Sequence, residues 1–108
     1  MHQDRGRGVT APELSAQEKE RILRGAVSSL SPLRLKVLPS KTAKKLVVLE
    51  AVAELFYPGE TYTQAEVNAR LEEIYPDPVT LRRDLVDFHF LCRTSDGARY
   101  WRPEPMQK

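Results

Sequence analysis

The sequence predicts a mainly α-helical fold with a small β-hairpin, arranged as a winged helix-turn-helix of the α+β class. Two observations support this prediction. Residues 42–89 contain three segments whose apolar residues recur at helical spacing, separated by short breaks. Further along, Asp96-Gly97 separates two short strand-like segments, which is typical of a hairpin. With 108 residues, the chain has room for one domain and a tail.

The first part of the chain is predicted to hold one helix ahead of the main domain. Residues 1–13 are rich in glycine, arginine and polar residues, and we expect them to be disordered. Ser15 and Glu18 have the spacing of a capping box, which begins a helix that runs to about Val27. Residues 28–32 are expected to be a linker. The predicted organisation is a disordered tail at 1–13, a helix and linker at 14–32, and a winged-helix-like domain at 33–103.

The main domain is predicted to begin with a strand and a central helix. Leu33, Leu35 and Val37 alternate along the chain, as in a short half-exposed strand, and Pro39 ends it. The helix that follows should run over about 42–56. Its apolar face is wide, which indicates a helix in the centre of the fold. The residues of that face are Leu46, Val48, Leu49, Val52, Ala53, Leu55 and Phe56.

Two further helices follow. The first, at about 63–75, begins at a capping box formed by Thr63 and Glu66. The second, at about 78–89, is expected to be capped by Asp77. Its first helical residue is a proline, where the missing N–H costs nothing.

The hairpin is predicted at about 91–102. Strand alternation should turn one of Tyr100 and Trp101 toward the helices. The residues predicted to be deeply buried in the core are Leu49, Phe56, Leu71, Leu85 and Phe88.

Charge is unevenly distributed, although the net charge is only +2. Residues 33–45 hold five basic residues and no acidic one, whereas residues 46–76 hold six glutamates and one arginine. A DNA-binding protein usually presents a broad basic face, because phosphate neutralisation supplies much of its affinity. The acidic segment therefore argues against a DNA-binding role.

The composition also bears on location and on disulfide chemistry. No segment approaches the roughly 18 consecutive apolar residues of a membrane span, and residues 1–8 lack the apolar centre of a secretory signal. We therefore expect a cytoplasmic protein that does not enter membranes. Cys92 is the only cysteine, which excludes an intrachain disulfide and a cysteine zinc cluster.

The helix at 78–89 is the candidate recognition helix, because it follows the tight turn of the helix-turn-helix. If its leucines face inward, Thr80 and Arg83 face outward, with Arg82 beside them. Thr80 and Arg83 could then reach base edges or phosphates. The alternative is that Arg83 pairs with Asp87 one turn later, a common solvent-exposed contact.

Further basic residues lie in the hairpin and at the start of the central helix. The hairpin offers Arg93, Arg99 and Arg102, which could follow a phosphate backbone or simply keep an edge strand soluble. The lysines at 41–45 oppose the helix dipole, an arrangement that phosphate contact or solubility could explain. The candidate nucleic-acid-binding residues are Lys41, Lys44, Lys45, Thr80, Arg82, Arg83, Arg93 and Arg99.

Catalytic and metal-binding constellations are missing from the sequence. His89 is the only histidine outside the first residues, which is too few for a triad or a zinc site. Glu72 and Glu73 are adjacent on a helix, so their side chains diverge. No glycine-rich phosphate loop is present. We therefore expect a protein that is not an enzyme and has no catalytic residues, metal site or cofactor.

Several segments of this chain have a characteristic order and spacing. They are Leu38-Pro39-Ser40-Lys41, Lys44-Lys45-Leu46-Val47-Val48-Leu49-Glu50-Ala51, Phe56, Tyr62-Thr63, Glu66-Val67-Asn68, Thr80-Leu81-Arg82-Arg83-Asp84-Leu85-Val86-Asp87 and Tyr100-Trp101. Over about residues 30–103 these segments resemble a bacterial family, domain of unknown function 2087. The resemblance implies a small winged-helix-like domain with a link to transcription, because family members often occur alone or fused behind ArsR-type regulators. The family's Leu-Arg-Arg motif corresponds to residues 81–83 and its basic segment to residues 41–45.

Two hypotheses about function remain open. One is a DNA-binding transcriptional regulator that contacts double-stranded DNA, supported by the helix order and by the arginines of the recognition helix and hairpin. The other is a module that docks on a protein partner or forms a homodimer. It is supported by the acidic segment and by the wide apolar face of the central helix. The DNA hypothesis gains if the basic side chains merge into one surface.

Overall fold

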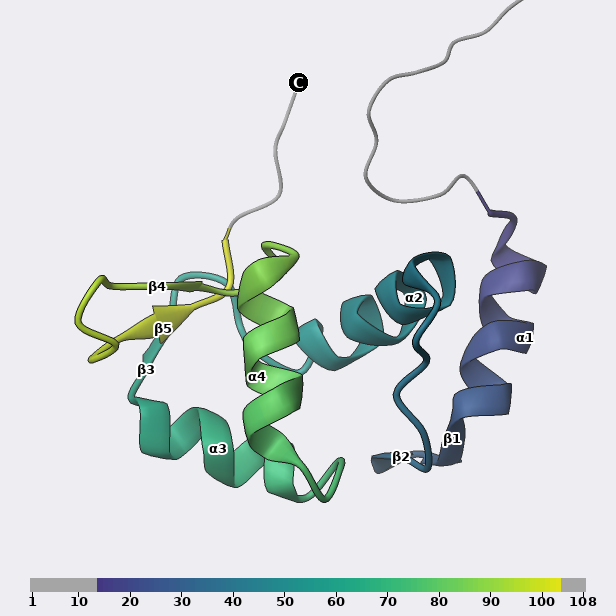
Figure 1. Ribbon diagram of the computed structural model, residues 1–108, viewed down its shortest axis with the longest axis horizontal. Helices are drawn as coiled ribbons and strands as arrows, with labels where there is room; N and C mark the ends of the chain where they lie inside the picture. The colour runs from purple at the N-terminus through teal and green to yellow at the C-terminus, as the bar shows by residue number, and fades with distance from the viewer. Residues whose placement is uncertain (1–13, 104–108) are drawn as a thin grey trace, which may run out of the picture.

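The computed structural model describes residues 14–103, so the tail predicted at 1–13 lies outside the described residues. Within that range the chain forms an α+β fold of four helices and two small antiparallel sheets (Figure 1). The elements in chain order are α1 (Ala16–Ala26), β1 (Val27–Leu30), β2 (Leu33–Leu35), α2 (Thr42–Ala53), β3 (Thr61–Tyr62), α3 (Gln64–Glu72), α4 (Pro78–Asp87), β4 (Cys92–Arg93) and β5 (Tyr100–Trp101).

Helix α1 begins at the predicted capping box. The Ser15 hydroxyl accepts a hydrogen bond from the Glu18 backbone N–H, and the Glu18 carboxylate accepts one from the Ser15 N–H. These two bonds satisfy amide groups that the first helical turn leaves without partners. The prediction for this end of the helix is confirmed.

The linker predicted at 28–32 is wrong, because part of this segment is a strand. β1 pairs antiparallel with β2, with Val27 opposite Leu35, and the turn between them contains a cis Ser31–Pro32 peptide. A strand as short as β2 needs a neighbouring strand for its backbone groups, and β1 provides it. The backbone N–H of Leu35 also donates to the Ile74 carbonyl at 2.8 Å, which attaches this hairpin to the end of α3.

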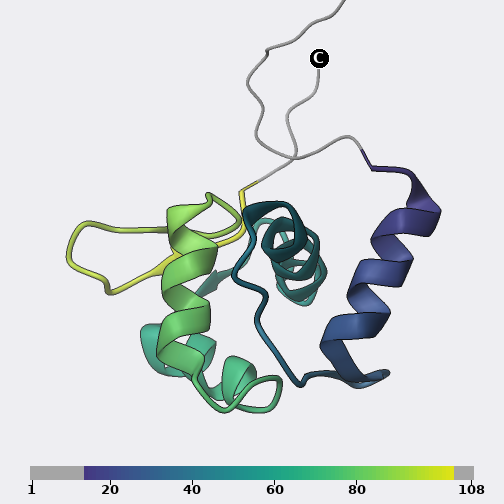
Figure 2. The same ribbon diagram turned by 45° about the vertical axis from the view of Figure 1, so that its right-hand side comes forward.

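Helix α2 lies at the centre of the fold, as predicted. Figure 2 shows it nearly end-on, between α1 on one side and α4 on the other. Val48, Leu49 and Val52 have no exposed surface, because the wide apolar face predicted from the sequence packs against several neighbours. The helix ends at Ala53, and Leu55 and Phe56 follow in a turn closed by backbone hydrogen bonds to Val52 and Ala53.

The three-stranded sheet joins distant parts of the chain. Its order is β3–β5–β4, so the last strand lies between the other two. Thr61 of β3 and Cys92 of β4 both face Trp101 of β5. Tyr100 is buried while Trp101 is half-buried, which agrees with the predicted alternation.

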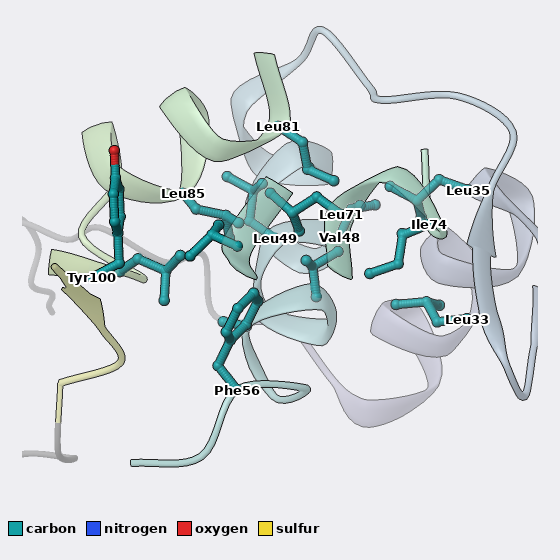
Figure 3. Packing of buried hydrophobic residues seen from close by; sticks show 14 of the residues in the cluster. Leu33, Leu35, Val48, Leu49, Phe56, Leu71, Ile74, Leu81, Leu85 and Tyr100 are labelled. Carbon is teal, nitrogen blue, oxygen red and sulfur yellow. The ribbon is translucent and has the colours of Figure 1, made fainter. Parts of the chain in front are cut away.

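The hydrophobic core extends from Tyr100 of β5 to Leu33 and Leu35 of β2 (Figure 3). It also includes Ala26 and Val27, so α1 and β1 pack on the same core as the rest of the chain. Four of the five residues predicted to be deeply buried have no exposed surface, and these are Leu49, Phe56, Leu71 and Leu85.

The prediction that Phe88 is deeply buried is wrong, because its side chain is 36% exposed. Helix α4 ends at Asp87, and the chain reverses through His89 in the left-handed region at φ 67°. The backbone N–H groups of Phe90 and Leu91 then donate to the Leu85 carbonyl. This turn brings Leu91, only 1% exposed, into the core.

Replacing Leu85 by alanine should lower the free energy of unfolding by about 2–5 kcal/mol, because the change leaves a cavity in the core. Val79→Ala on the same helix is the matched control. Val79 is 43% exposed, so its loss should change stability by less than about 0.5 kcal/mol. Chemical denaturation of both variants measures the difference. Equal losses would contradict the packing described for α4.

Candidate nucleic-acid interface

Helix α4 begins at Asp77, whose carboxylate caps it as predicted. One carboxylate oxygen accepts from the Thr80 backbone N–H at 3.2 Å, and the other accepts from the Thr80 hydroxyl at 2.7 Å. Both bonds hold the pKa of Asp77 below its ordinary value of 3.8, and the bond from the hydroxyl has the larger effect. The Thr80 hydroxyl proton is therefore engaged in the cap, although Thr80 is exposed.

Arg82 points toward the interior of the domain. Its guanidinium donates to the side-chain oxygen of Asn68 on α3, and it lies 6.0 Å from the centre of the Tyr100 ring on β5. The side chain is only partly exposed. Arg82 therefore connects α4 to α3 and the sheet, and this contact holds its guanidinium beside Asn68.

Lys45 is also engaged within the fold. Its ammonium group lies 3.2 Å from the Asp84 carboxylate, and the two side chains are only 21% and 17% exposed. The same ammonium group lies 5.9 Å from the centre of the Phe88 ring. This ion pair joins α2 to α4. Sequence reasoning did not assign Asp84 a role, although its position three residues after Leu81 places it beside the buried face.

Arg83 is the exposed arginine of α4. Within residues 14–103 its side chain forms no hydrogen bond or ion pair, and the alternative pairing with Asp87 is not formed. Exposed Val79 lies one turn earlier on the helix. Arg83 is therefore available to a molecule outside the domain.

The hairpin between β4 and β5 has a rigid turn. The Thr94 hydroxyl donates to the Asp96 carboxylate at 2.7 Å, and that carboxylate accepts from the Ala98 N–H at 3.0 Å. Both bonds lower the pKa of Asp96, and the bond from the Thr94 hydroxyl has the larger effect. Gly97 adopts φ 75°, a conformation that glycine reaches without steric cost. The predicted turn at Asp96-Gly97 is confirmed.

Two exposed arginines flank this turn. The Arg93 guanidinium donates to the carbonyl oxygens of Thr94 and Ser95 at 3.1 and 3.4 Å, and Arg99 donates to the Ala98 carbonyl at 3.4 Å. These contacts use carbonyl oxygens rather than carboxylates, so both positive charges remain uncompensated by an ion pair within residues 14–103.

The lysines at the start of α2 lie away from the hairpin. Lys41 and Lys44 are both exposed, and Lys44 borders α1 near Arg21 and Ile22. Figure 1 shows α1 and the β4–β5 hairpin at opposite ends of the molecule. Lys44 therefore lies near the end of the molecule opposite to the hairpin that carries Arg93 and Arg99.

Arg70 and Arg102 have a structural role that sequence reasoning missed. They donate to the Leu55 and Phe56 carbonyl oxygens at 3.2 and 3.0 Å, just after the carboxyl end of α2. Cations are favourable there because of the helix dipole. The Arg70 guanidinium also lies 5.0 Å from the centre of the Tyr62 ring. Arg102, considered above with the hairpin arginines, is therefore engaged with the core of the domain.

Within residues 14–103, no group of three or more His, Cys, Asp or Glu side chains is arranged to hold a metal ion. None of the helices in the same range has the length and apolar character that a membrane span requires.

The profile of a family described as "Uncharacterized protein conserved in bacteria (DUF2087)" matches residues 34–102. This match confirms the family resemblance drawn from the sequence motifs. No curated protein and no solved structure matches the chain.

Replacing Lys45 by alanine should lower the free energy of unfolding by about 1.5–3 kcal/mol, because Asp84 would remain mostly buried without its charged partner. Lys44→Ala is the matched control, since Lys44 is adjacent and exposed, and should change stability by less than about 0.5 kcal/mol. Thermal and chemical denaturation measure both variants. Indistinguishable losses would show that the ion pair contributes nothing.

Replacing Thr80 by alanine should raise the pKa of Asp77 toward 3.8, because the hydroxyl bond is the main cause of its depression. A carboxylate whose pKa is lower in the folded than in the unfolded protein stabilises the fold at pH values above its unfolded-state pKa. This stabilisation is lost as the pH falls through the folded-state pKa. Thr80→Ala should therefore destabilise the protein at about pH 6, and the difference should vanish in acid below the folded pKa. Thr80→Ser keeps the hydroxyl and should behave like the parent. NMR titration of the Asp77 carboxyl carbon measures the shift.

Proposed function

This chain belongs to the DUF2087 family, and we propose that it is a winged-helix transcriptional regulator that binds double-stranded DNA through α4 and the β4–β5 hairpin. The observation that carries the proposal is the exposure of Arg83 on α4 together with Arg93 and Arg99 on the hairpin, none of which forms an ion pair within residues 14–103.

The order of the elements supports a winged helix. Helix α2 is followed by β3, then by α3 and α4, and then by the β4–β5 hairpin, with β3 returning beside β5 in the sheet. In a winged helix, the helix in the position of α4 enters the major groove, while the hairpin follows the phosphate backbone beside it.

Arg83 is suited to direct contact with a base or a phosphate. An arginine presents a planar fork that matches the two acceptors of guanine in the major groove. No ion pair within residues 14–103 has to be broken before this side chain binds. In this proposal Arg83 enters the major groove of DNA, whereas Lys45, Thr80 and Arg82 have structural roles.

Arg93 and Arg99 are suited to phosphate contact that does not depend on base sequence. The hydrogen bonds of Thr94 and Asp96 hold the turn between them in one conformation. A preorganised turn loses less conformational entropy on binding. The hairpin would therefore add affinity rather than sequence preference.

The second candidate function, docking on a protein partner or a second copy of the chain, is favoured by apolar exposure on the same helix. Val79 and Phe88 are 43% and 36% exposed near the two ends of α4. Exposed glutamates on α3, Glu66 and Glu72 among them, would repel DNA phosphates. Sedimentation of the free protein tests this candidate.

Arg83→Ala should weaken binding to a preferred DNA site by about 1–3 kcal/mol if the side chain reads a guanine, and should weaken binding to random duplex less. Arg93→Ala and Arg99→Ala should weaken both alike, and each should reduce the magnitude of the slope of log K against log salt by about 0.9. The measurement is fluorescence anisotropy over a salt series, with a preferred site selected from a random library.

Arg24→Ala is the matched control, because Arg24 is an exposed arginine on α1 that pairs with Glu20. It should leave DNA affinity unchanged. If the parent protein shows no salt-dependent binding to any duplex at concentrations of tens of micromolar, typical of nonspecific binding, the DNA proposal is wrong. A dimer in sedimentation would then favour the docking function.

A further inference from the structure

A groove lies on the side of the molecule that carries α1. It encloses about 480 Å³ between α1, the segment after β2 and the first turns of α2. Small-molecule sites in proteins commonly range from about 300 to 1,000 Å³. The residues that line it are Arg21, Ile22, Gly25, Ala26, Val37, Pro39 and Lys44.

The lining combines an apolar surface with two positive charges. Ile22, Val37 and Pro39 supply apolar side chains, and Val37 is 47% exposed. Arg21 and Lys44 are the only charged residues in the lining. Within residues 14–103 neither of these two side chains forms an ion pair, and the first turn of α2 contains no acidic residue. An occupant of this groove should therefore be partly apolar and negatively charged.

Gly25 leaves space in the groove. A Cβ atom at this position would meet no atom within 4 Å outside its own stretch of helix, and Gly25 lies in α1 without a positive φ. Its backbone conformation therefore does not require glycine, and glycine destabilises a helix relative to alanine. The lack of a side chain at residue 25 keeps the groove open.

We propose that this groove binds a small amphipathic carboxylate, with the apolar body against Ile22, Val37 and Pro39 and the carboxylate held by Arg21 and Lys44. Arginine can bind a carboxylate through two parallel hydrogen bonds, and lysine adds a mobile positive charge. The site is independent of the proposed DNA interface, since α1 lies at the opposite end of the molecule from the β4–β5 hairpin (Figure 1).

Octanoate is the probe, and the full chain is titrated with it while backbone amide NMR shifts are recorded. The amide signals of Ile22, Gly25 and Val37 should move together along one saturating curve. 1-Octanol has the same number of carbon atoms but no charge, and should bind on the order of tenfold more weakly. Octylamine carries the opposite charge and should not move these signals.

Variants separate the two halves of the site. Arg21→Ala combined with Lys44→Ala should lower octanoate affinity on the order of tenfold, to the level of octanol, without changing octanol binding. Gly25→Leu fills the groove and should abolish binding of both compounds. Because Gly25 is exposed and helical, this variant should remain folded, which circular dichroism verifies. Arg24→Ala removes an arginine that does not line the groove and should leave octanoate affinity unchanged.

Three results would overturn the proposal. The first is that octanoate causes no saturating amide shifts in the residues lining the groove, whether the groove stays empty or is filled by another part of the chain. The second is an equal loss of octanoate affinity in Arg24→Ala and in the double variant that combines Arg21→Ala with Lys44→Ala. The third is octanol binding as tightly as octanoate. None of these results depends on whether the protein binds DNA.

Discussion

The burial of α2 is the constraint on which the rest of the structure depends. Its apolar residues are covered on several sides, so the polar groups near both ends of the helix need partners from distant parts of the chain. Asp84 of α4 neutralises Lys45 at the beginning. Arg70 and Arg102 bind the carbonyl groups just beyond the other end. These contacts fix α3, α4 and the sheet around the helix that they enclose.

Local features of the fold could be predicted from the sequence because each depends on neighbouring residues. The capping boxes, the proline at the start of α4 and the turn at Asp96-Gly97 involve atoms a few residues apart. Strand β1 was missed because Ser28 and Ser29 show no apolar alternation, and its pairing depends on β2. The family match agrees with the motifs, although it adds no activity.

Roles of charged residues were harder to predict. The spacing of apolar residues indicates which face of a helix a side chain lies on, but not which residue of another element it contacts. Arg82 was expected near DNA, yet it bonds to Asn68 of α3. Lys45 looked like part of a basic segment, yet its partner Asp84 lies on another helix. The predicted exposure of Thr80 and Arg83 on α4 agrees with the structure. Only the folded chain shows which charges are neutralised internally.

The central place of β5 has a consequence for synthesis on the ribosome. β5 is the last element of the described chain, and both other strands of the sheet pair with it rather than with each other. While the nascent chain still lacks Tyr100 and Trp101, β3 and β4 have no partner, and Tyr62 has no sheet to lie in. The four helices before β4 can form earlier, but the sheet can close only after residues 100 and 101 have left the exit tunnel. The three-stranded sheet therefore forms only once β5 has emerged, after the residues of all four helices.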